Sequence, residues 1–430
     1  MDRAAPKTSV ETGLETGLKK TGWRLLPYLL LMYVLAFLDR TNIGFAHDGL
    51  KHDAGLSETA YALGASIFFA GYAVLEIPSN LILERVGPRL WLSRIMVSWG
   101  LVSAMMMFVH GTVAFYGLRF ALGVCEAGFF PGVIWYLTRW FPPERRSQVF
   151  GLFYFGAPLS FILGGPVSGW LLALNGAGGL HGWQWLFLID GLAASVVGIG
   201  ALWFLTDRPE NASWLTPEEK QAILTAAGPP PAPEPLSAIG RSLAQPRVLA
   251  FAGLYGLIQM SVYGVVFFLP AQVSALLGHA IGPEVGLVSA VPWGVALIVT
   301  WLVPRWCDRH GHRQTAGALL LLIAAIGMAA SVATSIPAAG LTALSCAAAG
   351  FIAVQPLFWS LASQSLSGTR TAAAIALINT IGSVGSFLAP NLRAFTDSTT
   401  HHTGAGLWVL AALTALAALL ITSIKKPASD

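Results

Sequence analysis

Charged residues are scarce in this chain. Asp, Glu, Lys and Arg together make up 11% of its 430 residues, whereas apolar residues make up 55%. A soluble protein carries about 25% charged residues, so the composition excludes an ordinary soluble domain. Apolar runs of about 18 residues or more recur along most of the sequence and predict transmembrane helices. A transmembrane β-barrel is excluded as well, because its strands would be alternating segments of about ten residues.

Cysteine is also rare, with three residues in the whole chain. Cys125 and Cys346 fall in apolar segments, and Cys307 falls in a predicted short loop. We interpret all three as small packing residues rather than as disulfide partners or metal ligands. The predicted helices contain no nucleophile–base pair and no cluster of metal ligands. We therefore expect no enzyme activity, no metal and no cofactor, and an intramembrane enzyme or a receptor without transport activity is the least favoured class.

Twelve apolar segments are long enough to span a bilayer, six on each side of one long polar stretch. The predicted spans are 24–47, 58–83, 90–109, 112–138, 149–173, 183–205, 247–277, 283–304, 314–334, 337–364, 371–396 and 404–424. This pattern predicts an all-α polytopic membrane protein with two six-helix bundles, 1–205 and 247–430, joined by a linker at 206–246.

The linker contains signals for one short surface helix. Thr216-Pro-Glu-Glu219 is a capping box with proline at the first helical position. The proline-rich stretch 228–235 then predicts an extended, semi-rigid connector.

Lys and Arg lie almost entirely on one side of the predicted membrane. With the N-terminus inside, Lys51 and Arg393 fall outside, Arg40 and Arg119 fall within spans, and the rest of the 25 lie on the inner side or its tails. Cytoplasmic loops carry the excess of positive charge, so both termini are predicted to be cytoplasmic. The formal charge of +4 reflects this asymmetry, and we expect no nucleic-acid partner.

A charged loop motif occurs twice in corresponding positions. The copies are Asn80-x-x-x-Glu84-Arg85-x-Gly87-x-Arg89 and Pro304-x-x-x-Asp308-Arg309-x-Gly311-x-Arg313. The same offset carries Trp135 onto Trp359 and Pro166 onto Pro390. Several matches at one offset indicate two related halves, and a binding site near the midplane between them is typical of this architecture.

Six ionisable residues lie within spans of the N-terminal half, and the C-terminal half has none at comparable depth. They are Asp39, Arg40, Glu76, Arg119, Glu126 and Asp190. The offset maps Asp39 and Arg40 onto Tyr263 and Gly264. A charge at this depth costs roughly 2.5–3.5 kcal/mol, so each is a candidate functional residue until a structural partner is found.

Arg40 and Arg119 are predicted to lie at one level of the membrane. Each is about seven residues from the outer end of its helix, which places both guanidinium groups roughly 10 Å below the outer surface. A guanidinium binds a carboxylate through two parallel hydrogen bonds, so the pair suits an anionic substrate. The alternative is that each arginine neutralises a nearby acid and seals the bundle.

Asp39 and Glu126 are candidate proton sites. Neighbouring residues on a helix point about 100° apart, so Asp39 cannot pair fully with Arg40. We predict an exchange in which the deprotonated acid holds an arginine, and protonation releases that arginine for the substrate. A structural salt bridge is the alternative. We assign Glu76 to the network around Glu84 and Arg85, and we expect Asp190 to have a structural partner.

Several stretches resemble the major facilitator superfamily and, within it, the anion:cation symporter family. They are the repeated loop motif, Leu38–Ala46, Phe68–Asn80, Arg119–Pro131 and Trp214–Glu219. The resemblance covers essentially the whole chain. It implies proton-driven import of a small organic anion, such as tartrate, phthalate or a sugar acid, across the bacterial inner membrane. We expect the protein to function as a monomer.

The resemblance also implies roles for individual residues. Arg40 matches the position that holds the carboxylate, Asp39 and Glu126 match proton-carrying acids, and Tyr72, Trp359 and Asn379 match positions around the anion. Both loop motifs, Glu84 to Arg89 and Asp308 to Arg313, are implied to be cytosolic gates. The neutral groups Gln259, Tyr263, Gln272 and Gln355 stay candidates for packing or for ligand contact.

A second function is open at this point. Gly164-Gly-Pro166 in the fifth span resembles a motif of proton-driven antiporters, which would export drugs or metabolites. An exporter of cationic drugs would present lone acids, whereas arginines accompany the acids here, and this pattern favours an anion.

Overall fold

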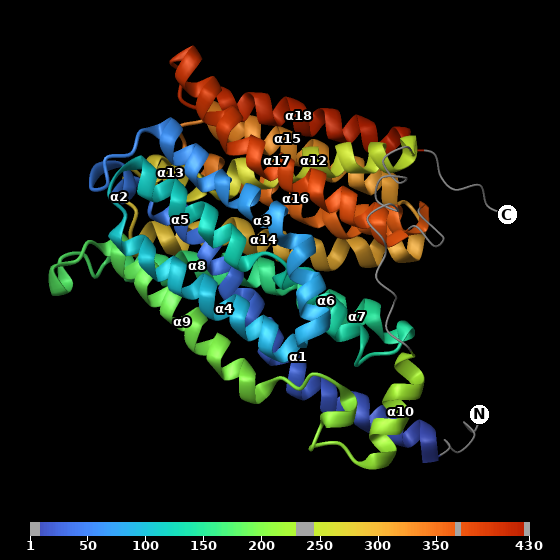
Figure 1. Ribbon diagram of the computed structural model, residues 1–430. Coiled ribbons are helices and arrows are strands. Elements are labelled where there is room, and N and C mark those ends of the chain that lie inside the picture. The colour runs from blue at the N-terminus through green and yellow to red at the C-terminus, as the bar shows by residue number, and fades with distance from the viewer. Residues whose placement is uncertain (1–8, 229–244, 366–370, 425–430) are drawn as a thin grey trace.

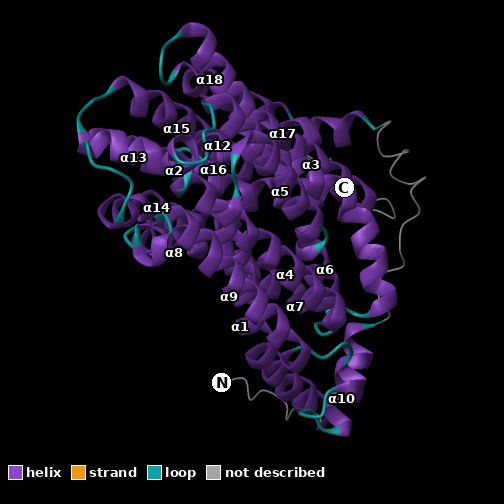
Figure 2. Ribbon diagram, turned by 60° about the vertical axis from the view of Figure 1, so that its left-hand side comes forward, coloured by secondary structure: helices purple, strands orange, loops and turns teal. Residues whose placement is uncertain are grey.

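The computed structural model describes residues 9–228, 245–365 and 371–424. Within these ranges every regular element is a helix (Figures 1 and 2). Eleven helical segments are long and apolar enough to cross a membrane. The 30-residue α17 (Thr371–Thr400) packs along α12 and α3 as a further long helix. The predicted all-α polytopic fold with twelve transmembrane helices is confirmed.

From residue 9 onward, where the structure describes it, the N-terminal half contains nine α-helices. They are α1 (Ser9–Phe45), α2 (His47–His52), α3 (Glu58–Val86), α4 (Pro88–Met105), α5 (Gly111–Glu126), α6 (Phe129–Thr138), α7 (Pro143–Tyr154), α8 (Gly156–Leu172) and α9 (Gly182–Phe204). α5 and α6 together form one crossing, as do α7 and α8. The break between α5 and α6 lies at Gly128, whose φ of +84° is in the left-handed region that favours glycine.

The linker and the C-terminal half continue with helices only in the described residues. They are α10 (Pro217–Ala227), α12 (Pro246–Val266), α13 (Leu269–Leu277), α14 (Pro283–His310), α15 (Arg313–Ala333), α16 (Pro337–Ser365), α17 and α18 (Ala405–Ser423). The predicted span 247–277 is interrupted at Phe267 and Phe268, which separate α12 from α13.

The predicted linker helix is α10, and its capping box is confirmed. The Thr216 hydroxyl accepts a hydrogen bond from the Glu219 backbone, and the Glu219 carboxylate accepts one from the Thr216 backbone. α10 packs on the cytosolic end of α1, where Ile223 lies against Gly17. This packing covers the part of α1 that precedes the predicted span. The predicted extended connector at 228–235 lies outside the described residues apart from Gly228, which ends α10.

The first loop motif shapes the turn between α3 and α4. Gly87 has a φ of +98°, and a Cβ atom there would lie 2.8 Å from a carboxylate oxygen of Asp207. The same carboxylate accepts a hydrogen bond of 2.9 Å from the backbone N–H of Arg89. The motif is thereby tied to the start of the linker. A gating role for the two motifs stays a prediction.

The two halves touch most extensively along two pairs of helices, α8 with α14 and α3 with α17, and α1 also contacts α13. In Figure 1, α4 and α9 lie on one side of these pairs, and α15 and α18 lie on the other. The α8–α14 contact is backbone to backbone. A Cβ atom on Gly165 would lie 2.1 Å from the carbonyl oxygen of Gly286, and one on Gly286 would lie 2.2 Å from that of Gly165. Only glycine allows this approach.

We expect Gly165→Ala to destabilise the protein by roughly 1–3 kcal/mol, because α8 and α14 must move apart to admit the methyl group. The measurement is the thermal unfolding midpoint of the purified protein in detergent. Gly294→Ala on α14 is the matched control, since a Cβ atom there meets no other atom within 4 Å. Equal midpoints for the two variants would show that the close approach contributes nothing to stability.

Candidate functional site

Arg40 and Glu126 form an ion pair inside the N-terminal half. Arg40 lies on α1 and Glu126 is the last residue of α5, and an Nη2–Oε1 contact joins them. The Glu126 side chain is fully buried and the Arg40 side chain is 13% exposed. The Nε of Arg40 and the Oε2 of Glu126 have no hydrogen-bond partner among the described residues. Both members of the pair therefore keep a polar atom that a ligand or a proton can use.

Aromatic rings surround the Arg40 guanidinium. Its Cζ lies 4.7 Å from the ring centroid of Phe37, 5.3 Å from that of Phe68 and 5.6 Å from that of Tyr72. Cation–π contacts stabilise a positive charge whose hydration shell has been removed. Arg40 is therefore held as a cation beside a single buried carboxylate.

The C-terminal half contributes Tyr263 to the same place. Its hydroxyl is in electrostatic contact with Arg40, and its ring lies 4.6 Å from Phe69 of α3. The sequence singled out Tyr263 only as one of several neutral polar groups. The signal that points to it is the repeat, because Tyr263 occupies the position equivalent to Asp39.

Asp39 is buried apart from the Arg40–Glu126 pair. The Ser103 hydroxyl of α4 donates a hydrogen bond to its Oδ1, and Oδ2 has no partner among the described residues. As expected, Asp39 and Arg40 turn toward different neighbours. Asp39 thus has one free carboxylate oxygen in a buried position.

Arg119 and Arg40 both lie beside the Phe68 ring, and their common level in the membrane stays a prediction. The Cζ of Arg119 lies 5.3 Å from the Phe68 ring centroid, the same distance as that of Arg40. The side chain is buried, and it donates hydrogen bonds to the carbonyl oxygens of Gly64 at 3.2 Å and Ala65 at 2.9 Å. These hydrogen bonds join α5 to α3, so they favour the sealing of the bundle over direct contact with a substrate, although the partners are backbone carbonyls rather than the predicted acid.

Glu76 has a different partner from the one predicted. Its Oε1 accepts a hydrogen bond of 3.1 Å from the Nδ2 of Asn379 on α17, so it links the two halves. The assignment of Glu76 to the loop network around Glu84 is wrong for this reason. The spacing of residues along one helix could not predict this contact, because Asn379 lies 303 positions from Glu76 in the chain.

Asp190 has the structural partner that was expected. Its Oδ2 accepts a hydrogen bond of 2.8 Å from the Nδ2 of Asn42, whose own oxygen accepts one from Ser168 at 3.0 Å. The three side chains connect α9, α1 and α8 within the N-terminal half.

The remaining predicted site residues lie on the C-terminal half. Trp359 packs edge-to-face on Tyr255, with ring centroids 5.0 Å apart. Tyr255 in turn packs against Gly382 of α17, where a Cβ atom would lie 2.5 Å from its ring. Gly382 is about one helical turn from Asn379. Trp359 and Asn379 are both half-buried. The N-terminal half therefore supplies the charges, and the C-terminal half supplies aromatic and amide groups.

Glycines stand where the C-terminal half lacks charges. Gly350, the equivalent of Glu126, packs so closely on α15 that a Cβ atom would lie 2.2 Å from the Leu320 carbonyl oxygen. Gly264, the equivalent of Arg40, packs on Leu410. At these two positions the C-terminal half therefore has close helix packing, where the N-terminal half has an ion pair.

Comparisons with known proteins agree on one family. The profile of the Major Facilitator Superfamily matches residues 29–390. The inner membrane transport protein RhmT of Escherichia coli is 44% identical over 412 residues, 96% of each chain. A putative tartrate transporter of Agrobacterium vitis is 43% identical over 407 residues, which cover 94% of this chain and 90% of the relative.

A solved structure shares the fold. A bacterial homologue of the human lysosomal transporter Spinster, in an inward-facing and unoccupied conformation, superposes with a TM-score of 0.76 over 94% of this chain and 98% of the other. The two sequences are 17% identical.

Proposed function

Because this chain belongs to the major facilitator superfamily, we propose that it imports a small organic anion together with protons by alternating access. The protein is a multi-pass transporter of the bacterial inner membrane, not an enzyme. The buried Arg40–Glu126 pair carries the proposal, because an arginine held by a single acid can exchange that acid for a carboxylate of the substrate.

The proposed cycle begins with a proton that reaches Glu126. Protonation removes the negative charge that faces Arg40, and the guanidinium then binds a carboxylate of the substrate through two parallel hydrogen bonds. Arg40 has an unpartnered Nε for this purpose. When the substrate leaves on the inner side, Arg40 attracts the Glu126 carboxylate again and the proton departs. Substrate and proton therefore cross together.

Asp39 serves as a second proton site in this proposal. Its Oδ1 is held by Ser103, and its Oδ2 is unpartnered among the described residues. A charged Asp39 in electrostatic contact with Arg119 and Arg40 balances one of two buried cations. Protonation of Asp39 raises the net positive charge around the site, which favours entry of an anion.

The neutral groups of the site orient the rest of the substrate. Tyr72 and Tyr263 lie near Arg40 from opposite halves, and this proximity supports a role for both in contacting a bound anion. Trp359 and Asn379 then contact the substrate from the C-terminal half. The relative named as a putative tartrate transporter supports a carboxylate as substrate.

Uptake into proteoliposomes tests the proposal. Labelled tartrate, phthalate and a sugar acid are supplied outside, with the lumen either more alkaline than the medium or at the same pH. We expect one class of carboxylate to accumulate, and only when the lumen is alkaline. Two other results would instead support the antiporter that exports drugs or metabolites. One is substrate uptake that an alkaline lumen inhibits, and the other is transport of a cationic drug without transport of any carboxylate.

A further inference from the structure

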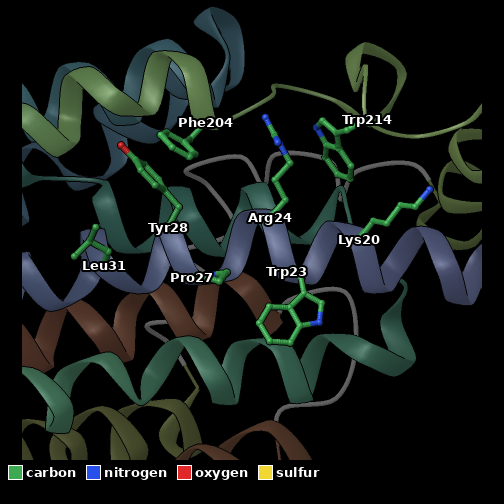
Figure 3. A pocket seen from close by; sticks show the side chains of 8 residues that line it. All are labelled: Lys20, Trp23, Arg24, Pro27, Tyr28, Leu31, Phe204 and Trp214. Carbon is green, nitrogen blue, oxygen red and sulfur yellow. The ribbon is translucent and has the colours of Figure 1, made fainter.

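A groove lies at the cytosolic end of α1, far from Arg40. It has a volume of about 580 Å³ and is lined mainly by basic and aromatic side chains (Figure 3). They are Lys20, Trp23, Arg24, Pro27, Tyr28 and Leu31 of α1, Phe204 at the end of α9, and Trp214 of the linker. Arg24 and Arg40 are 16 positions apart on one helix, about 24 Å along its axis. The groove is therefore separate from the candidate transport site.

Arg24 supplies a cation that forms no ion pair with an acid of the described residues. Its guanidinium lies over the Trp214 ring, 5.6 Å from the centroid. Figure 3 shows the side chain directed toward the space between Phe204 and Trp214. A second cation, Lys20, is already paired with Glu219 at 2.8 Å. The mouth of the groove thus keeps a net positive charge.

The rest of the groove is apolar and faces outward. Tyr28 stacks on Phe204, with ring centroids 4.7 Å apart. Leu31 is 43% exposed, Phe204 is 51% exposed and Trp23 is 76% exposed. An exposed ring such as Trp23 and a half-buried ring such as Tyr28, near the start of an apolar span, mark the boundary between headgroups and hydrocarbon. The groove therefore runs from the headgroup level into the acyl region.

We propose that this groove binds an anionic phospholipid of the cytosolic leaflet. The phosphate group lies against Arg24 and Lys20, and the first part of an acyl chain lies along Tyr28, Leu31 and Phe204. Charge complementarity carries the assignment, because the cytosolic leaflet holds anionic lipids and a basic pocket on its side attracts their headgroups. A zwitterionic lipid would bring its own cation next to Arg24.

Such a lipid would connect the linker to the N-terminal half. Trp214 lies on the linker and also stacks on Trp140, with ring centroids 5.6 Å apart. Glu219 of α10 accepts hydrogen bonds of 2.8 and 3.0 Å from Lys20, which also lines the groove. Arg24 contacts Trp214 of the linker, and Lys20 contacts Glu219 of α10. A phosphate between Arg24 and Lys20 would therefore lie next to both contacts and would hold the linker against α1.

Native mass spectrometry of the full-length protein tests this assignment. The protein is purified in detergent and mixed with phosphatidylglycerol, with phosphatidylcholine, or with inorganic phosphate alone. We expect one phosphatidylglycerol to stay bound at energies that remove phosphatidylcholine, and inorganic phosphate to be released. The Lys20→Gln/Arg24→Gln variant should retain about 10- to 30-fold less phosphatidylglycerol. Retention of inorganic phosphate to the same degree as lipid would show an anion site without a lipid.

Arg94→Gln is the matched control. Arg94 is an exposed arginine over Trp91, 4.8 Å from the ring centroid, but it lines no part of this groove. The control should retain the lipid like the wild type. Equal retention of the two lipids by the wild type would overturn the proposal, and this comparison needs no variant to fold. An equal loss in Arg94→Gln and the double variant would overturn it as well.

Discussion

Replacement of Arg40 by lysine is expected to lower uptake of the transported carboxylate by about 10- to 150-fold. Lysine keeps the positive charge but provides a single ammonium group in place of the planar guanidinium, so one hydrogen bond to the carboxylate is lost. A hydrogen bond to a charged group contributes about 1.5–3 kcal/mol, which corresponds to this range. Initial uptake rates in proteoliposomes over a series of substrate concentrations measure the effect.

The controls separate the loss of a ligand from the loss of the fold. Arg305→Lys alters an exposed arginine that lies 4.1 Å from the Trp301 ring centroid, and uptake should be unchanged. Thermal unfolding of Arg40→Lys should stay within a few degrees of the wild type, since Glu126 keeps a cation beside it. Wild-type uptake by Arg40→Lys would refute the assignment of Arg40 as the anion ligand.

Replacement of Glu126 by glutamine is expected to abolish accumulation against a gradient while leaving exchange of substrate intact. Glutamine has the shape of a protonated glutamate and cannot release a proton, so the driving force is no longer coupled to the substrate. When each proton moves together with one negative charge of the substrate, each unit of pH gradient accumulates the substrate about tenfold for every proton. In Glu126→Gln the ratio of inside to outside substrate should fall to one.

Two assays on the same vesicles make this outcome specific. Counterflow exchange of substrate at equal pH should continue in Glu126→Gln. It should also continue in Asp39→Asn. Glu144→Gln, which alters an exposed acid in the first turn of α7, should accumulate substrate like the wild type. If both Asp39→Asn and Glu126→Gln accumulate substrate with a proton gradient, neither acid couples the proton to transport.

The sequence alone was sufficient for the fold and for the choice of charged residues. A charge within an apolar span is costly in any neighbourhood, so Asp39, Arg40 and Glu126 stand out without knowledge of their partners. Rise per residue along a helix is constant, so counting residues predicts a common level for Arg40 and Arg119, and both lie beside the Phe68 ring. The capping box at Thr216 is local for the same reason, because both of its hydrogen bonds lie within four residues.

Partners across the bundle were decided by tertiary structure. Arg40 and Glu126 are 86 positions apart, and Glu76 and Asn379 are 303 positions apart. Residue spacing predicts the depth and face of each side chain on its own helix. It does not predict which remote helix stands opposite that face, because this depends on how all the helices pack. That packing determines three contacts. They are the ion pair of Arg40 with Glu126, the hydrogen bonds from Arg119 to backbone carbonyl oxygens, and the hydrogen bond between Glu76 and Asn379.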